Sequence, residues 1–104
     1  MEMHEIRYFL AVYDECSFRR AAIRCGVSQP SVSNAIRALE RKLGVLLFRR
    51  KPRIEATDFA RKIHPHLQEI AGKVECLQEA ARSDPSHAVG LPRAMRPDPS
   101  PASS

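Results

Sequence analysis

The sequence has little of what most enzymes and membrane proteins require. Its 104 residues include no Trp, three Cys and only four Gly. The Gly are scattered, and no P-loop, GxGxxG or HExxH motif occurs, which excludes the common phosphate-cradling and zinc-hydrolase sites. No window approaches the roughly eighteen apolar residues of a membrane span, and the N-terminal residues do not resemble a signal peptide. We therefore expect no enzyme, no membrane association and a cytoplasmic protein.

The cysteines and histidines do not form a metal or disulfide pattern. Cys16, Cys25 and Cys76 are odd in number and contain no CxxC pair. His64 and His66 are two residues apart, so on a helix they point in nearly opposite directions and cannot share a metal ion. We expect reduced thiols, no metal and no cofactor.

What the sequence does contain is concentrated positive charge. The formal net charge is +5, yet residues 17–56 alone carry ten Lys or Arg against two acids, a net +8. Residues 1–16 carry −3. A solvated basic face is the alternative, but this density fits a polyanion-binding site better.

Apolar spacing predicts helices in the first part of the chain. One amphipathic stripe is formed by Ile6, Phe9, Leu10 and Tyr13. We expect this helix to end near Cys16. Ser17 is the predicted N-cap of a short second helix, Phe18–Arg24, and Gly26 supplies the positive φ that ends it.

A third helix follows directly. Ser28 is its predicted N-cap, Pro30 is tolerated in its first turn, and Gly44 ends it. Its buried stripe consists of Val32, Ile36, Leu39 and Leu43. A helix, a short Gly-containing turn and a second helix that begins with small polar side chains is the helix-turn-helix arrangement, whose second helix enters the major groove of DNA. An ordinary helical hairpin with a polar outer face remains the alternative.

The next segment predicts a wing and then a long helix. Apolar runs at 45–48 and 54–56 flank a basic tip at 49–53, which is typical of two short strands that present cations to phosphates or the minor groove. Thr57 then caps a helix whose apolar residues alternate spacings of four and three. This seam, which predicts dimerisation, comprises Phe59, Ile63, Leu67, Ile70, Val74, Leu77 and Ala81. The alternative is a helix packed on its own domain.

These predictions divide the chain into three parts. Residues 1–57 form a winged helix-turn-helix domain, residues 58–82 a linker and dimerisation helix, and residues 83–104 a tail. The tail contains five Pro and five Ser without apolar periodicity, so we expect it to be disordered. The fold class is mainly α: three helices, a two-stranded wing and a long final helix.

Four motifs together resemble the N-terminal DNA-binding domain of LysR-type transcriptional regulators. They are SFRRAA (17–22), VSQPSVS (27–33), IRALERKLG (36–44) and LFRR (47–50), followed by ATDFARKIHPHL. The resemblance covers residues 1 to about 80. It implies a winged helix-turn-helix, a dimerising linker helix and promoter binding. Family members continue into an effector-binding domain, whereas this sequence continues into the Pro- and Ser-rich tail. We therefore expect no small-molecule effector site in this chain.

The resemblance also assigns positions. Base reading falls on Gln29, Pro30, Ser33 and Asn34, while Arg37 contacts phosphate or base and Arg50 with its neighbours forms the basic wing. The full set of expected DNA-binding residues is Arg19, Ser28, Gln29, Pro30, Ser31, Ser33, Asn34, Arg37, Arg49, Arg50, Lys51 and Arg53. Four features depart from the family pattern: Arg19 before RAA, Asn34 where Arg is common, a shorter wing, and Ala60 in place of Gly.

We therefore expect a dimeric, sequence-specific DNA-binding protein, associated with the nucleoid, on a pseudo-palindromic promoter site. The alternative is an interaction module whose linker helix forms mixed dimers with a full-length relative and so modulates that relative's DNA binding. An RNA-binding role lacks exposed aromatic residues among the basic ones.

Overall fold

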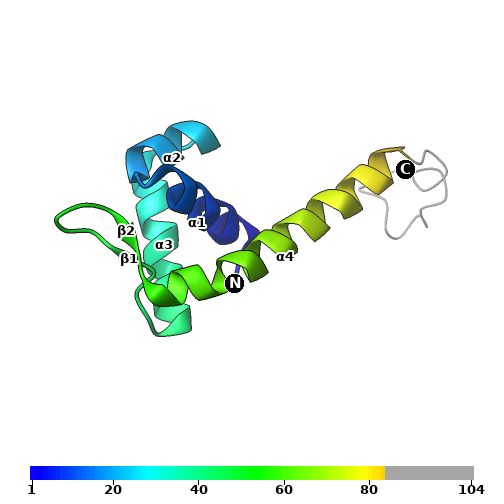
Figure 1. Cartoon of the computed structure of the whole chain (residues 1–104). Helices are drawn as coiled ribbons and strands as arrows, with labels where there is room; N and C mark the ends of the chain where they lie inside the picture. Colours follow the sequence, from blue (N-terminus) through cyan, green and yellow to red (C-terminus); the bar gives the residue numbers. More distant parts are fainter. Residues whose placement is uncertain (84–104) are drawn as a thin grey trace. The chain divides into compact units, whose positions relative to one another are not determined.

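The computed structural model describes residues 1–83, within which the chain forms four helices and one two-stranded hairpin (Figure 1). In chain order the elements are α1 (Met3–Glu15), α2 (Phe18–Cys25), α3 (Gln29–Leu43), β1 (Phe48–Arg49), β2 (Glu55–Ala56) and α4 (Asp58–Ser83). The predicted mainly helical class, with a hairpin and a long final helix, is confirmed. The predicted disordered tail lies outside the described residues except for Ser83, which is the last residue of α4.

The predicted helix starts are confirmed because each depends on local chemistry. The side chains of Ser17, Ser28 and Thr57 accept hydrogen bonds of 3.0, 3.2 and 3.2 Å from the backbone N–H three residues further along. These bonds satisfy N–H groups that have no partner inside the first turn of a helix. The three caps fix where α2, α3 and α4 begin.

Three helices end in the left-handed backbone conformation, which was predicted at two of these ends and not at the third. Gly26 and Gly44 end α2 and α3 in the left-handed region, with φ of 70° and 76°, as expected. Cys16 ends α1 in the same region with φ of 53°. A side chain in that region costs about 1 kcal/mol, so the turn between α1 and α2 is strained at Cys16.

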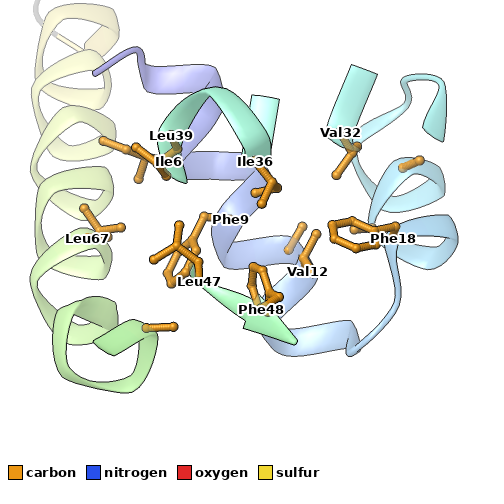
Figure 2. Packing of buried hydrophobic residues seen from close by; sticks show 14 residues of the cluster. Ile6, Phe9, Val12, Phe18, Val32, Ile36, Leu39, Leu47, Phe48 and Leu67 are labelled. Carbon is orange, nitrogen blue, oxygen red and sulfur yellow. The ribbon is translucent and has the colours of Figure 1, made fainter. Parts of the chain in front are cut away.

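The core lies where α1, α2 and α3 pack pairwise and the hairpin closes over them. The largest fully buried side chains are Phe9, Val12, Val32, Ile36, Leu39, Leu47 and Phe48. Figure 2 shows Leu67 of α4 pointing toward Phe9 and Leu47. The rings of Phe9 and Phe48 lie 5.5 Å apart at their centroids. This packing holds α3 by its apolar stripe and leaves the opposite face of α3 to solvent.

The hairpin is shorter than predicted and begins later. β1 pairs antiparallel with β2, with Phe48 opposite Ala56 and Arg49 opposite Glu55. The prediction of a strand over 45–48 was wrong for its first three residues, because Val45 and Leu46 are exposed and the N–H of Leu47 is bonded to a side chain of α3. The apolar run was a correct sign of burial only at Leu47 and Phe48.

The first part of α4 is attached to the hairpin and to α1. The N–H of Thr57 donates to the carbonyl of Leu47 at 2.9 Å, and its hydroxyl donates to the carbonyl of Leu46 at 2.9 Å. The ring of His64 stacks on Tyr13 with centroids 3.8 Å apart. Among residues 1–83, no helix has the length and apolarity to cross a membrane.

Candidate nucleic-acid interface

The polar face of α3 presents most of the predicted reading residues to solvent. Gln29, Pro30, Asn34 and Arg37 are exposed, whereas Ser33 is half-buried. All lie away from the stripe of α3 that packs into the core. The structure thus brings the predicted base-reading side chains to one face of one rigid helix, as a major-groove element requires.

Two predicted residues of this set are engaged with each other. Ser28 caps α3 by accepting from the N–H of Ser31, and the two hydroxyl groups lie 2.8 Å apart. Both side chains are exposed. A hydroxyl has two acceptor lone pairs and one hydrogen, so the pair retains capacity for a further partner.

The basic residues after α3 fall into two classes. Arg49, Lys51 and Arg53 are exposed at the hairpin and its tip. Arg50 is different, because its guanidinium donates to the carbonyl of Phe48 at 2.9 Å and pairs with Glu40 at 3.4 Å. Arg19 on α2 is exposed as well. Sequence reasoning grouped Arg50 with its neighbours, whereas the structure holds this side chain against the protein.

Glu40 supports the interface, and the sequence analysis did not single it out. Its carboxylate, on a side chain only 8% exposed, accepts hydrogen bonds from the N–H of Leu47 at 2.8 Å and of Phe48 at 3.4 Å. The Arg50 guanidinium completes the set and lies 5.2 Å above the ring of Phe18. One buried acid of α3 thereby fixes the base of the hairpin. The available signal was an acidic residue directly after the buried Leu39.

A second unpredicted ion pair joins α1 to α3. Both carboxylate oxygens of Glu5 accept from Lys42 Nζ, at 3.0 and 2.9 Å, and one also accepts from the N–H of Glu2. Burial raises the pKa of Glu5, but these donors outweigh burial and hold the pKa below its ordinary value. The pair ties the beginning of α1 to the end of α3 and keeps this acid charged.

Two open grooves flank α3. The first, which we call the wing groove, has a volume of about 560 Å³ and is lined by Arg37, Glu40, Arg41, Gly44, Val45, Leu46 and Arg50. The second, which we call the α1 groove, has a volume of about 500 Å³ and is lined by His4, Glu5, Tyr8, Ser31, Asn34, Ala35, Ala38 and Arg41. Arg41 lines both, so this side chain stands between them.

The predicted dimerisation seam is divided in its exposure. Phe59, Ile63 and Leu67 pack against the core cluster of their own domain. Further along α4, Ile70 is 43% exposed and Leu77 is 72% exposed. Of the remaining seam residues, Val74 is half-buried and Ala81 is exposed. The sequence prediction treated the seam as uniform, whereas its first half is covered within the chain.

The residues 1–83 contain no cluster of three or more His, Cys, Asp or Glu that could hold a metal ion. Cys16, Cys25 and Cys76 are free. What the site offers is an exposed polar helix, a basic hairpin and hydrogen-bond donors. These features define a winged helix-turn-helix unit of the kind that binds DNA.

Comparison with known proteins identifies the family. Residues 3–61 match the family model described as bacterial regulatory helix-turn-helix protein, lysR family. The chain belongs to this family of DNA-binding transcriptional regulators, which are not enzymes. The resemblance seen in the sequence motifs is therefore confirmed.

Two curated relatives are similar over the same part of the chain. The HTH-type transcriptional regulator IlvR of Caulobacter vibrioides is 41% identical over 83 residues, which are 79% of this chain and 28% of IlvR. The HTH-type transcriptional regulator BudR of Klebsiella aerogenes is 42% identical over 82 residues, 78% of this chain and 54% of BudR. The chain thus spans between about a quarter and a half of the length of these relatives.

Two solved structures of protein–DNA complexes share the fold. The CbnR DBD–DNA complex superimposes with a TM-score of 0.73 at 32% identity, over 80% of this chain and 97% of the CbnR chain. The complex of the BenM DBD with catB site 1 DNA gives 0.75 at 28% identity, over 80% of this chain and 94% of the BenM chain. This chain therefore shares its fold, over nearly the whole length of the CbnR and BenM chains, with two domains seen in complex with DNA.

Proposed function

We propose that this chain binds double-stranded DNA sequence-specifically, with α3 in the major groove and the hairpin as a wing on the backbone or minor groove. The observation that carries the proposal is the exposed polar face of α3, held rigid by its apolar stripe. Small polar side chains, an amide and a guanidinium on that face can hydrogen-bond base edges. The similarity to the CbnR and BenM complexes supports the proposal.

The base-reading residues in this proposal are Gln29, Pro30, Ser33 and Asn34. Gln and Asn side chains can form two hydrogen bonds with adenine, and an Arg can do so with guanine. Arg37 contributes from the next turn of α3, toward phosphate or base. Ser28 and Ser31 provide hydroxyl groups at the start of α3, where its backbone N–H groups also favour a phosphate.

The phosphate contacts divide according to exposure. Arg49, Lys51 and Arg53 on the wing, with Arg19 on α2, are exposed and can each neutralise a phosphate. Arg50 acts chiefly by holding the wing to α3 through Glu40, because its guanidinium already has protein partners. Replacement of Arg50 should therefore lower stability as well as affinity.

A dimer is the second part of the proposal. Ile70, Val74, Leu77 and Ala81 repeat at spacings of four, three and four along α4, and two of them are large exposed apolar residues. Such a seam favours pairing with an equivalent helix. Two α3 helices in one dimer would enter successive major grooves roughly 34 Å apart on a pseudo-palindromic promoter site.

The experiment that tests both parts is selection of bound duplexes from a random pool, with the full chain as bait. We expect enrichment of two inverted half-sites whose centres lie about ten base pairs, or a multiple of this, apart. A pool that stays random after selection would refute sequence-specific binding. A single half-site would refute the dimeric mode alone.

A further inference from the structure

The α1 groove brings three hydrogen-bond donors that the sequence did not assign to DNA binding, His4, Tyr8 and Arg41, next to two that it did, Ser31 and Asn34. His4 and Tyr8 on α1 face Ser31, Asn34 and Arg41 on α3 across it. The side chain of each of these five residue types carries an N–H or O–H group. His4 and Tyr8 also contact each other edge to face, with ring centroids 5.6 Å apart. A groove lined in this way suits an anion with several acceptor oxygens.

The one acid in the lining does not oppose an anion. Glu5 is buried, and both of its oxygens are bonded to Lys42. Its charge is thereby compensated by the Lys42 ammonium group. Arg41 is exposed, and no ion pair within residues 1–83 engages its guanidinium. The net character of the groove is that of a donor site with one unpaired cation.

The position of the groove indicates which anion it meets. Ser31 and Asn34 belong both to this groove and to the exposed face of α3. Phosphate groups line both edges of the major groove, so a protein wall beside an inserted helix lies against the backbone of one strand. His4 and Tyr8 on α1 form such a wall beside the exposed face of α3, and Arg41 separates this groove from the wing groove.

We propose that the α1 groove binds one backbone phosphodiester of duplex DNA, with His4 and Arg41 as its principal donors. The proposal rests on the proposed function and deepens it, since it adds α1 to the DNA-binding surface. It implies that both the wing and α1 contact the DNA backbone beside the α3 helix. The groove supplies affinity and register, not base preference.

The test uses a duplex recovered by the selection experiment, in which each phosphate in turn is replaced by a neutral methylphosphonate. For the full chain, replacement at one position in each half-site, the one that contacts the α1 groove, should weaken binding roughly tenfold. His4→Ala and Arg41→Ala should each weaken binding to the unmodified duplex, and each should lose the penalty at that one position. The slope of log affinity against log salt should fall by about 0.9 for Arg41→Ala.

The matched control is Arg7→Ala, which removes an exposed cation from α1 outside the groove. Arg7→Ala should retain the full methylphosphonate penalty. If His4→Ala and Arg41→Ala also retain it, the groove does not contact phosphate, and the proposed function stands without it. If the unaltered chain binds no duplex, both proposals fall. His4 and Arg41 are exposed, so circular dichroism should show both variants folded.

Discussion

Removal of the Glu40 carboxylate should destabilise the domain more than any other single charge change near the wing. In Glu40→Ala, the N–H of Leu47 loses its 2.8 Å bond and the N–H of Phe48 loses a weaker one at 3.4 Å. A buried donor left unsatisfied costs about 1–3 kcal/mol. The guanidinium of Arg50 loses its partner too, but it keeps the carbonyl of Phe48 and is 29% exposed.

These terms combine to an expected loss of about 3 kcal/mol in the free energy of unfolding, at the lower end of the roughly 3–5 kcal/mol lost when a fully buried pair is broken. Small domains are stable by only about 5–15 kcal/mol, so the change is a large fraction of the total. Glu40→Gln keeps one acceptor for Leu47 and removes the charge, and it should lose about 1–2 kcal/mol.

The assay is urea unfolding followed by far-ultraviolet circular dichroism at a fixed protein concentration, because dimerisation would make stability concentration-dependent. Glu69→Ala and Glu69→Gln are the matched controls, since Glu69 is an exposed acid on α4. Both controls should lie within about 0.5 kcal/mol of the unaltered chain. If Glu40→Ala shifts the midpoint no more than Glu69→Ala does, the carboxylate does not hold the wing.

Four further predictions follow from the structure. Glu5→Gln should lower the free energy of unfolding at neutral pH. The difference from the unaltered chain should disappear as the pH falls below the ordinary glutamate pKa of 4.5, because a carboxyl whose pKa is lowered in the folded state stabilises only while it is ionised. A difference in urea midpoint that stays constant from acid to neutral pH contradicts this. Cys16→Gly should raise stability by about 0.5–1 kcal/mol by relieving the φ of 53°, and a lower thermal midpoint would count against strain there. Asn34→Ala should relax the base preference in the selection experiment whereas Arg49→Ala should weaken all duplexes about equally, and an unchanged selected motif for Asn34→Ala would exclude that residue from base reading. Ile70→Asp should halve the mass in solution measured by light scattering, while Gln68→Asp, a matched exposed position, should leave it unchanged; equal masses for all three proteins would exclude the seam.

Features that depend on neighbours in the chain were predictable. The N-caps at Ser17, Ser28 and Thr57 and the ends at Gly26 and Gly44 were identified from residue type and spacing alone. Each involves a hydrogen bond or a backbone angle within four residues. Such local chemistry is present in the sequence itself, and so the bounds of α2 and α3 were predicted to within a residue.

Features that depend on distant contacts were not predictable from the pattern. Glu5 and Lys42 are 37 residues apart, and Glu40 and Arg50 are separated by ten. An acid beside an apolar stripe looks the same in sequence whether it faces water or a buried N–H. For this reason Arg50 was grouped with the exposed cations of the wing, and the half of the α4 seam that packs on its own core was not distinguished from the exposed half.

The single residue Thr57 links the base of the hairpin to the first turn of α4 through its hydrogen bonds. Its N–H and hydroxyl donate to the carbonyls of Leu47 and Leu46, and the same hydroxyl accepts from the N–H of Ala60 in the first turn of α4. Because only Thr57 lies between β2 and α4, a movement of the first turn of α4 is passed directly to the base of the wing through the hydrogen bonds of this residue. Thr57 thereby couples the position of the base of the wing to that of the first turn of α4.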